Sequence, residues 1–331
     1  ARRIIGGQEH LEFLGKTKWV VLLEQAGSRK LTCTGSIIGK RWVVTAAHCF
    51  LNKDNDGFVE DQGTSLIYDC TELCEVGSKG CSCKRAYATD VYQHPCYTAS
   101  TNQDHDDIAL IRTDVDLIAD WEFPVAVHGL NGTFEIKAGE QANVSGFGTV
   151  SNDPQARSQT LMRVSLPVVS EETCRQANPS TTALNFVDFA NTVCAGGREG
   201  KDSCTGDSGG PISMMLDGDL EWVVGVLSIG SELPDDTSDC AVEGRYGVYT
   251  RTDKYANWIY KTMTGEGFEC ACSTTSSTRD PCTGVAPAIY TPMPLAQRPV
   301  KVWSAGPSSP RASHLTLLFA AALSLALLSA R

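Results

Sequence analysis

The stretch Gly206-Asp207-Ser208-Gly209-Gly210-Pro211 decides how this chain is interpreted. Small residues around one serine leave its hydroxyl uncrowded, and they let the backbone turn so that successive N–H groups point at one developing negative charge. Serine is a weak nucleophile at neutral pH, so this chemistry needs an adjacent base and a third group that orients the base. A glycine-rich turn with a serine is also common without such a role. The base and its partner therefore have to be found elsewhere in the chain.

Two other motifs supply a histidine and an aspartate. Thr45-Ala46-Ala47-His48-Cys49 puts His48 after an apolar, strand-like run, and Asp106-Asp107-Ile108-Ala109-Leu110 puts Asp107 before another. Taken singly, such a histidine is usually a core residue and such an aspartate a turn residue. Together with Ser208, in three separate motifs, they predict a nucleophilic serine with its base and its orienting acid.

The composition narrows the class of protein. With 331 residues, 42% of them hydrophobic and 20% charged, the chain is typical of a globular protein. Its net charge of -11 argues against a nucleic-acid partner, because phosphate binding requires a basic face. Fourteen cysteines predict disulfides and an oxidising compartment, although a cysteine cluster also suits zinc. Asn131-Gly132-Thr133 and Asn143-Val144-Ser145 fit the sequon for N-glycosylation, with Asn131 as the candidate site.

The hydrophobic pattern predicts strands over most of the chain. Short apolar runs, broken by Gly- and Asp-rich turns, lie at residues 19–23, 41–45, 107–112, 141–144 and 221–227. Many short strands at irregular spacing are typical of an all-β sandwich or barrel. One helix is expected near residues 252–263, where apolar and aromatic residues recur at helical spacing.

The three motifs resemble those of the trypsin-like serine proteases of the chymotrypsin family, and the resemblance extends from about Ile4 to Thr264. It implies an all-β fold of two six-stranded antiparallel β-barrels with a C-terminal helix, in a protease domain at residues 4–265. It also implies that His48 is general base and then general acid, that Asp107 orients it, and that Ser208 attacks the scissile carbonyl. Asp107 is chosen over Asp104 and Asp106, expected to be solvated loop acids, because it directly precedes Ile-Ala-Leu.

The resemblance implies roles for residues around this triad. The N–H groups of Gly206 and Ser208 would form the oxyanion hole, and Ser228 would support Asp107 from behind. Asp202 would lie at the base of the pocket for the residue before the scissile bond. The other pocket residues implied are Ser203, Gly230 and Gly247. An open slot that ends in a carboxylate suits the side chains of Arg and Lys.

The sequence Arg2-Arg3-Ile4-Ile5-Gly6-Gly7 resembles the family's activation site. Cleavage between Arg3 and Ile4 would free an ammonium group, which in the family is buried against the aspartate before the nucleophile, here Asp207. Residues 1–3 would then be a propeptide remnant. Arg2 and Arg3 are alternatively a polar leader, but the Ile-Ile-Gly-Gly that follows favours an activation site.

Some positions depart from the family pattern. Ile229 and Phe147 stand where tryptophan is usual, and Tyr246 stands where the digestive enzymes usually have proline. In the family, tyrosine at that position accompanies sodium-sensitive activity, so a sodium site is an open alternative. The acidic residues 231–239 form an insertion, expected at the rim of the pocket.

The cysteines divide into a family set and an extra set. The resemblance implies the pairs Cys33 with Cys49, Cys174 with Cys194, and Cys204 with Cys240. Five cysteines remain at residues 70–96 and three in the tail, at Cys270, Cys272 and Cys282. Because both numbers are odd, full oxidation requires at least one disulfide between this loop and the tail.

The composition changes beyond the protease domain. Residues 266–303 are rich in Cys, Ser, Thr and Pro and are expected to form a stalk. Residues 304–331 resemble the signal for a GPI anchor, with small residues at Ser304-Ala305-Gly306, a short polar spacer and an apolar segment at 315–330. A plain membrane tail is the alternative, although the segment is short for a spanning helix.

These features together predict a secreted serine endopeptidase that cuts after Arg or Lys. It is expected to be made as a zymogen and held at the outer face of the plasma membrane by a GPI anchor. The expected partners are protein or peptide substrates, an activating trypsin-like protease, protein inhibitors and the outer membrane leaflet. We expect no cofactor, metal or nucleic acid. A protease-like binding module without catalysis is disfavoured because no triad residue is missing, and a soluble digestive trypsin because of the tail and the acidic insertion.

Overall fold

The structure is a computed structural model of the chain. It describes residues 4–9, 18–25, 30–50, 64–70, 72–97, 106–118, 124–149, 157–177, 189–216, 220–230, 240–267, 270 and 272. The propeptide remnant, the acidic insertion, most of the expected stalk and the whole anchor signal lie outside these residues.

The first half of the chain forms a closed antiparallel barrel of six strands in the order β2-β3-β4-β7-β6-β5. Apolar side chains such as those of Val21, Leu66 and Ile111 fill its interior. The strands are β2 (Val20–Gln25), β3 (Lys30–Gly39), β4 (Trp42–Thr45), β5 (Thr64–Tyr68), β6 (Lys84–Gln93) and β7 (Ala109–Thr113).

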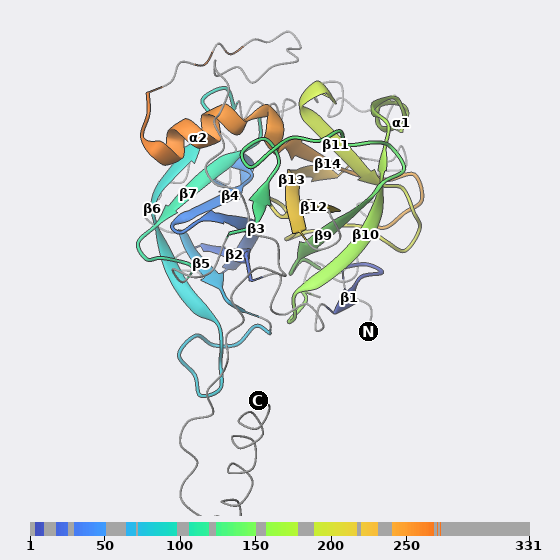
Figure 1. Cartoon of the computed structure of the whole chain (residues 1–331). Helices are drawn as coiled ribbons and strands as arrows, with labels where there is room; N and C mark the ends of the chain where they lie inside the picture. Colours follow the sequence, from blue (N-terminus) through green and yellow to red (C-terminus); the bar gives the residue numbers. More distant parts are fainter. Residues whose placement is uncertain are drawn as a thin grey trace, which may run out of the picture. The chain divides into compact units, whose positions relative to one another are not determined.

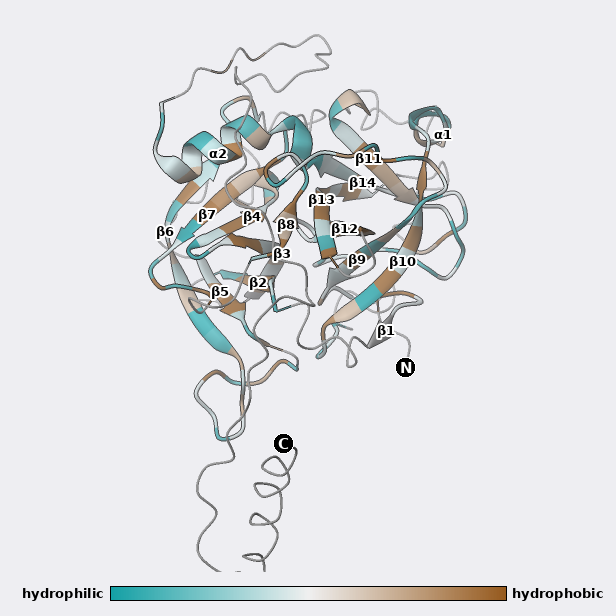
Figure 2. Cartoon of the chain, viewed as in Figure 1, coloured by the Kyte–Doolittle hydropathy of each residue, from teal (hydrophilic) through white to brown (hydrophobic). Residues whose placement is uncertain are grey.

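The second half forms another barrel, closed because β9 pairs with both β10 and β12. Buried residues alternate strictly with half-buried ones along β10, as expected of a strand with one face in a core (Figure 2). The barrel strands are β9 (Gln141–Gly146), β10 (Met162–Val169), β11 (Thr192–Gly196), β14 (Tyr246–Arg251), β13 (Leu220–Gly230) and β12 (Pro211–Leu216). Two short strands extend it, since β1 (Gln8–Glu9) pairs with β10 and β8 (Ala126–Val127) with β13.

The two barrels contact each other through β2, β3 and β4 on one side and β9, β12 and β13 on the other (Figure 1). The predicted fold of two six-stranded antiparallel barrels with a C-terminal helix is therefore confirmed.

That helix, α2 (Ala256–Thr264), packs Trp258 and Ile259 into the core of the first barrel. It begins later than the sequence predicts, because Thr252–Lys254 form the 3-10 turn η5. It ends where Gly265 adopts a left-handed conformation, with φ 74, which glycine accepts without strain. Two further 3-10 turns among the described residues are η2 (Ala47–Phe50) and η4 (Phe189–Asn191).

A second helix, α1 (Glu171–Gln176), was not expected from the sequence. The hydroxyl of Ser170 caps it by accepting a hydrogen bond from the N–H of Thr173 at 3.0 Å. Only Cys174 of this helix is buried, so the helix has no apolar stripe that a periodicity argument would detect.

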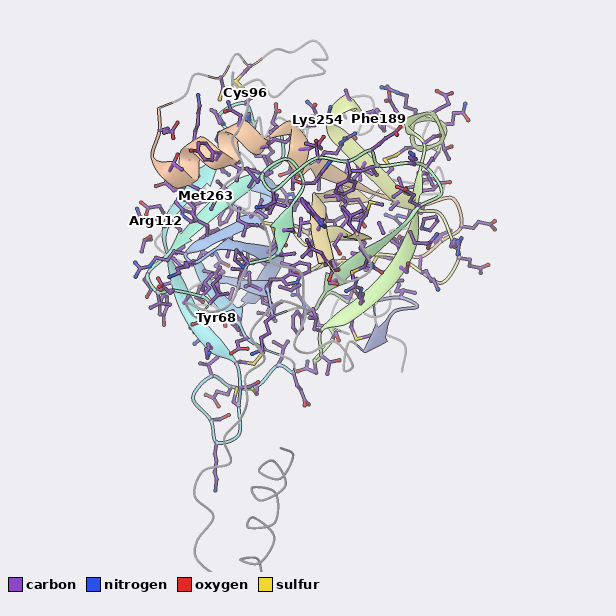
Figure 3. All side chains as sticks on the ribbon, in the orientation of Figure 1. Tyr68, Cys96, Arg112, Phe189, Lys254 and Met263 are labelled. Atoms are coloured by element: carbon purple, nitrogen blue, oxygen red, sulfur yellow. A yellow bond between two sulfur atoms is a disulfide. The ribbon has the colours of Figure 1, made fainter. Side chains whose placement is uncertain are left out.

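The structure joins Cys33 to Cys49, Cys174 to Cys194 and Cys204 to Cys240. The extra cysteines form Cys70–Cys83, Cys74–Cys81 and Cys96–Cys272, and Cys270 is also disulfide-bonded. Cys96, labelled in Figure 3, carries the bridge between loop and tail that the cysteine count requires. Every cysteine that the structure describes is oxidised, so these residues offer no thiolate to a zinc ion.

In the part of the chain that the structure describes, no helix has the length and apolar character needed to cross a membrane.

Candidate active site

His48 and Asp107 lie side by side because the strands next to them are paired. His48 is in the turn η2 directly after β4, and Asp107 lies just before β7. In the antiparallel register of β4 and β7, Thr45 is opposite Ala109, which brings the end of one strand next to the start of the other. Nδ1 of His48 is 2.8 Å from Oδ2 of Asp107, and the backbone N–H of His48 donates to Oδ1 at 2.9 Å.

The carboxylate of Asp107 is fully buried, and both of its oxygens have hydrogen-bond partners. The hydroxyl of Ser228 donates to Oδ2 of Asp107 at 2.5 Å, and the hydroxyl of Thr250 donates to its backbone carbonyl at 3.0 Å. Burial by itself raises the pKa of Asp107, but the charge of His48 and the hydrogen bonds from His48 and Ser228 outweigh it and hold the pKa below its ordinary value. Asp107 is therefore an anion at neutral pH.

Asp106 has a different environment from the one expected for a solvated loop acid. Its Oδ1 accepts a hydrogen bond from the hydroxyl of Tyr255 at 2.8 Å, so that expectation was wrong for Asp106. Tyr255 is fully buried in front of α2, and it finds its polar partner in this carboxylate. Asp104 lies outside the described residues.

The turn that carries Ser208 is held against the first barrel. The backbone N–H of Thr34 donates to the carbonyl of Ser208 at 2.8 Å, and the hydroxyl of Thr34 donates to the carbonyl of Gly206 at 3.0 Å. A Cβ on Gly209 would lie 2.1 Å from Oγ1 of Thr45, so only glycine fits at this contact. Thr45 is three residues before His48, so the same contact brings the serine turn close to the histidine turn.

The backbone around Ser208 leaves two amide donors available. Gly206 has φ 96, a conformation that favours glycine. Among the hydrogen bonds of the described residues, none uses the N–H of Gly206 or of Ser208 as donor. Unpaired adjacent amides are the donor arrangement that an oxyanion hole requires.

Asp202 lies buried near this turn, with 4% of its surface exposed. Its Oδ2 accepts a hydrogen bond from the backbone N–H of Ala241 at 3.1 Å, whereas its Oδ1 has no hydrogen-bond partner. Burial raises the pKa of Asp202 to about 6, although hydrogen bonds from Ala241 and Ser203 oppose the rise. The buried hydroxyl of Tyr249 donates to Oγ of Ser203 at 3.4 Å.

Gly230 and Gly247 are opposite each other in the register of β13 and β14. Because neither has a side chain, the space between the sheet and Asp202 is not filled from these two positions. A Cβ on Gly247 would come within 2.8 Å of the Tyr249 ring. The structure thus brings together the residues that were expected to form a pocket with a carboxylate at its base.

The sequence model of the family described as Trypsin matches residues 4–259. The chain belongs to the trypsin family. It is 34% identical to coagulation factor IX of Oryctolagus cuniculus over 258 residues, which cover 77% of this chain and 83% of that protein. It is 32% identical to kallikrein-8 of Mus musculus over 253 residues, which cover 74% of this chain and 81% of that protein. This trypsin-family chain is a serine endopeptidase.

In the protease, Asp207 is a second buried carboxylate close to Asp202. Its two oxygens accept hydrogen bonds from the backbone N–H groups of Gly148 at 2.8 Å and Cys204 at 2.9 Å. Burial raises the pKa of Asp207 to about 6, against the effect of these two hydrogen bonds. Gly146 and Gly148 make room for it, since a Cβ at either position would lie within 2.5 Å of the carboxylate.

Ile4 of the protease is fully buried in the core of the second barrel. The segment after it is held by the N–H of Asp202, which donates to the carbonyl of Ile5 at 3.1 Å. Gly6 contacts Gly200 so closely that a Cβ would lie 2.0 Å from its carbonyl oxygen. The residues just after the expected activation site therefore pack beside residues 200–202, which include the pocket residue Asp202.

The three residues of the protease that depart from the family pattern are buried to different degrees. Phe147 is almost fully buried in the large core cluster. Ile229 and Tyr246 are partly buried and pack around the Cys174–Cys194 disulfide. The ring of Tyr246 also lies against Gly197, where a Cβ would approach it to 2.3 Å.

The two glycosylation sequons of the protease differ in their setting. Asn143 is in the middle of β9, where its neighbours Ser165 and Ser213 lie on the two paired strands. Asn131 lies in the turn after β8, and its Oδ1 accepts a hydrogen bond from the N–H of Val127 at 2.7 Å. A glycan needs an accessible turn or loop, which favours Asn131.

The unpaired oxygen of Asp202 predicts a pH-dependent stability. We expect Asp202→Asn, in a Ser208→Ala background that prevents self-digestion, to raise the free energy of unfolding at pH 8, because asparagine keeps the acceptor for Ala241 and removes the buried charge. A folded-state pKa of about 6 against an ordinary 3.8 corresponds to about 3 kcal/mol. The folded state binds a proton more readily than the unfolded state, so the stability of the wild type falls as the pH rises from about 4 to 6. Below about pH 4 the difference in stability between Asp202→Asn and the wild type should disappear. Urea unfolding at several pH values measures it.

Asp107→Asn is the matched control for this measurement. The pKa of Asp107 is lowered in the folded state rather than raised. The Asp107 carboxylate therefore stabilises the fold at pH values above its ordinary pKa, and the substitution should destabilise the protein at pH 8. If Asp202→Asn were also less stable at pH 8, the attraction between Asp202 and Arg245, which lowers the pKa of the carboxyl, would outweigh the effect of burial, contrary to the raised pKa.

Proposed function

We propose that this protease hydrolyses peptide bonds after Arg or Lys, with Ser208 as nucleophile, His48 as general base and acid, and Asp107 as the orienting anion. The observation that carries the proposal is the hydrogen-bonded series from Ser228 through the buried Asp107 to Nδ1 of His48. Because Asp107 is an anion at Nδ1, that nitrogen carries the proton and Nε2 of His48 is left as the base.

The catalytic steps follow from this arrangement. Nε2 of His48 takes the hydroxyl proton as Ser208 attacks the carbonyl carbon, and the buried Asp107 stabilises the imidazolium that forms. The unpaired N–H groups of Gly206 and Ser208 donate hydrogen bonds to the developing oxyanion, and losing one such donor typically costs about 10²–10³ in rate. His48 then gives the proton to the leaving amine, and water repeats the sequence on the acyl-enzyme.

The charge preference follows from Asp202. Its Oδ1 is buried without a hydrogen-bond partner, and an unpaired buried carboxylate is costly until a cation pairs with it. The long side chains of Arg and Lys would reach such a site between Gly230 and Gly247, beside the guanidinium of Arg245, which lies 3.7 Å from a Cβ built on Gly230. The hydroxyl of Ser203 supports Lys as well as Arg, because it offers a further acceptor.

The test is cleavage of a peptide library by the protein after activation, with the products identified by mass spectrometry. We expect cuts after Arg and Lys, and Ser208→Ala should lower kcat by about 10⁶-fold. Ser78→Ala, in an exposed turn of the loop at 72–83, is the control and should retain the activity. Cuts after aromatic or small residues would contradict the role of Asp202, and near-normal activity in Ser208→Ala would contradict the triad.

Activation by cleavage between Arg3 and Ile4 is proposed on the burial of Ile4 and Asp207. A new ammonium group on Ile4 would add a positive charge beside Asp207, whose pKa burial raises to about 6 even though the Arg157 guanidinium opposes the rise. Pairing of these two groups would stabilise the turn from Gly206 to Gly210, because Asp207 lies within it.

The chain that still carries Ala1-Arg2-Arg3 should therefore be almost inactive, and treatment with trypsin should activate it. Arg3→Gln should block activation, whereas Arg2→Gln, which leaves the bond after Arg3 intact, should not. Asp207→Asn should give a protein that is cut but weakly active. N-terminal sequencing and peptide hydrolysis measure both steps, and full activity in uncut protein would refute the switch.

An extracellular location is proposed from the disulfides, which persist in oxidising compartments. Attachment through a GPI anchor near Ser304 is proposed from the sequence alone, since residues 304–331 lie outside those described. If the apolar segment at 315–330 were kept and left in water, it would expose many apolar side chains. Each methylene group that is not buried costs about 0.8 kcal/mol.

In animal cells, we expect the protein at the cell surface and its release by phosphatidylinositol-specific phospholipase C. Truncation at about residue 304 should send it into the medium with its activity intact. Mass spectrometry of the surface protein decides the matter, because a mature form that retains residues 315–330 would show that the segment stays in the membrane.

A further inference from the structure

A cationic side chain lies on the oxyanion turn without a hydrogen-bond or ion-pair partner among the described residues. A Cβ built on Gly206 would lie 3.3 Å from Nη1 of Arg157 and 3.4 Å from its Cζ, so the guanidinium covers the outer side of that glycine. Arg157 is half-buried, and it makes no hydrogen bond or ion pair with its side chain among the residues that the structure describes. A partly desolvated guanidinium with free donors is a ready site for a carboxylate.

Arg157 is close to Asp207 but is not its partner. The guanidinium helps to lower the pKa of Asp207, yet the two oxygens of that carboxylate accept from the N–H groups of Gly148 and Cys204. Since no hydrogen bond among the described residues uses the guanidinium of Arg157, its five N–H donors remain available to a ligand.

The backbone of Arg157 is held in place from within the second barrel. Arg157 forms a β-bridge with Thr149, and the N–H of Thr149 donates to the carbonyl of Thr205 at 2.8 Å. The N–H of Ser158 donates to the carbonyl of Gly148 at 3.1 Å. The backbone of Arg157 is thus connected through Thr149 to Thr205, the residue before Gly206.

A loop of the first half of the chain, closed by two of the extra disulfides, contacts residues 159–160, which follow Arg157. The N–H of Leu73 donates to the carbonyl of Gln159 at 2.6 Å, and Glu72 forms a β-bridge with Thr160. The loop that contains Leu73 is closed by the disulfides Cys70–Cys83 and Cys74–Cys81. A disulfide-closed loop has little freedom to move, so it fixes residues 159–160 and, through them, the position of Arg157.

The location of Arg157 defines which part of a substrate would meet it. The pocket with Asp202 is walled by Gly230 and Gly247 on β13 and β14, and it receives the residue before the scissile bond. Arg157 lies instead at the junction of β9 and β10, beside the other flank of Gly206. A peptide that places its carbonyl oxygen at the N–H of Gly206 therefore sends the residues after the scissile bond toward Arg157.

We propose that Arg157 forms a subsite that selects an acidic side chain, Asp or Glu, in the first two residues after the scissile bond. The proposal rests on the proposed function, because it takes Ser208 as the nucleophile and Gly206 as an oxyanion donor. The substrate class becomes peptides with a basic residue before the cut and an acidic residue soon after it.

The expected preference is moderate because Arg157 is only half-buried. An ion pair at such a site changes kcat/KM by about two- to fivefold at low salt, and screening reduces the effect as ionic strength rises. A charge preference that is independent of salt would indicate a different origin.

The experiment uses the activated full-length chain and quenched fluorescent peptides with Arg before the scissile bond. The two residues after the bond are varied among Asp, Asn and Lys, and each peptide has a C-terminal amide, so that the varied side chain is the only carboxylate on that side. The readout is the ratio of kcat/KM for the Asp peptide to that for the Asn peptide. This ratio does not depend on the folded fraction of the enzyme, since both peptides meet the same preparation.

We expect a ratio of about two to five for wild type, about one for Arg157→Gln, and a preference for the Lys peptide over the Asn peptide in Arg157→Glu. Arg175→Gln removes the same charge from the exposed helix α1 and should keep the wild-type ratio. A wild-type ratio near one, or a ratio that survives in Arg157→Gln, would overturn the inference.

A short arginine amide with no amino acid after the scissile bond separates the two proposals. If wild type hydrolyses this amide but shows no preference among the peptides, the subsite is refuted and the proposed function stands. If it hydrolyses neither after cleavage at Arg3, the proposed function fails, and the inference fails with it.

Discussion

The contact between the serine turn and the first barrel is the constraint on which the rest of the site depends. Gly209 sits so close to Thr45 and to the carbonyl of Thr34 that no side chain fits there. Thr34 in turn holds the carbonyls of Gly206 and Ser208. Because His48 and Asp107 belong to one barrel and Ser208 to the other, the catalytic geometry exists only where the barrels are packed together. A chain with either barrel alone would have an incomplete site.

The buried carboxylates of the second barrel show that the fold gives up stability for function. Both oxygens of Asp107 accept hydrogen bonds, which offset the free-energy cost of burying its charge, so Asp107 remains an anion. Asp202 and Asp207 are buried, and burial raises their pKa values to about 6 although Arg245 and Arg157 oppose the rise. Such raised pKa values are typical of functional sites, where binding or processing later supplies a further positive charge.

The sequence predicted the motifs and the barrels well because both are local signals. The strand at 141–144, for example, and the turn at Gly206-Asp207-Ser208 can be found without knowing what they pack against. The helix α1 was missed because it has no apolar stripe. Its local signals, the Ser170 cap and the Glu171–Arg175 pair, could have indicated it. The partner of Asp106 is Tyr255, far away in sequence, and no local pattern reports such a contact. For the same reason, nothing near Arg157 in the sequence indicates that it lies on Gly206.

The Cys96–Cys272 bridge changes how the domain carries mechanical load. Cys272 follows α2 along the chain, but its sulfur is bonded to Cys96 in the segment just after β6. A pull on the chain beyond Cys272 is therefore transmitted through a covalent bond into the first barrel, and α2 is bypassed. The strands of a closed barrel share such a load through hydrogen bonds on both sides, whereas a terminal helix would peel away from its end. The disulfide thus makes the first barrel, and not α2, the mechanical anchor point of the protease.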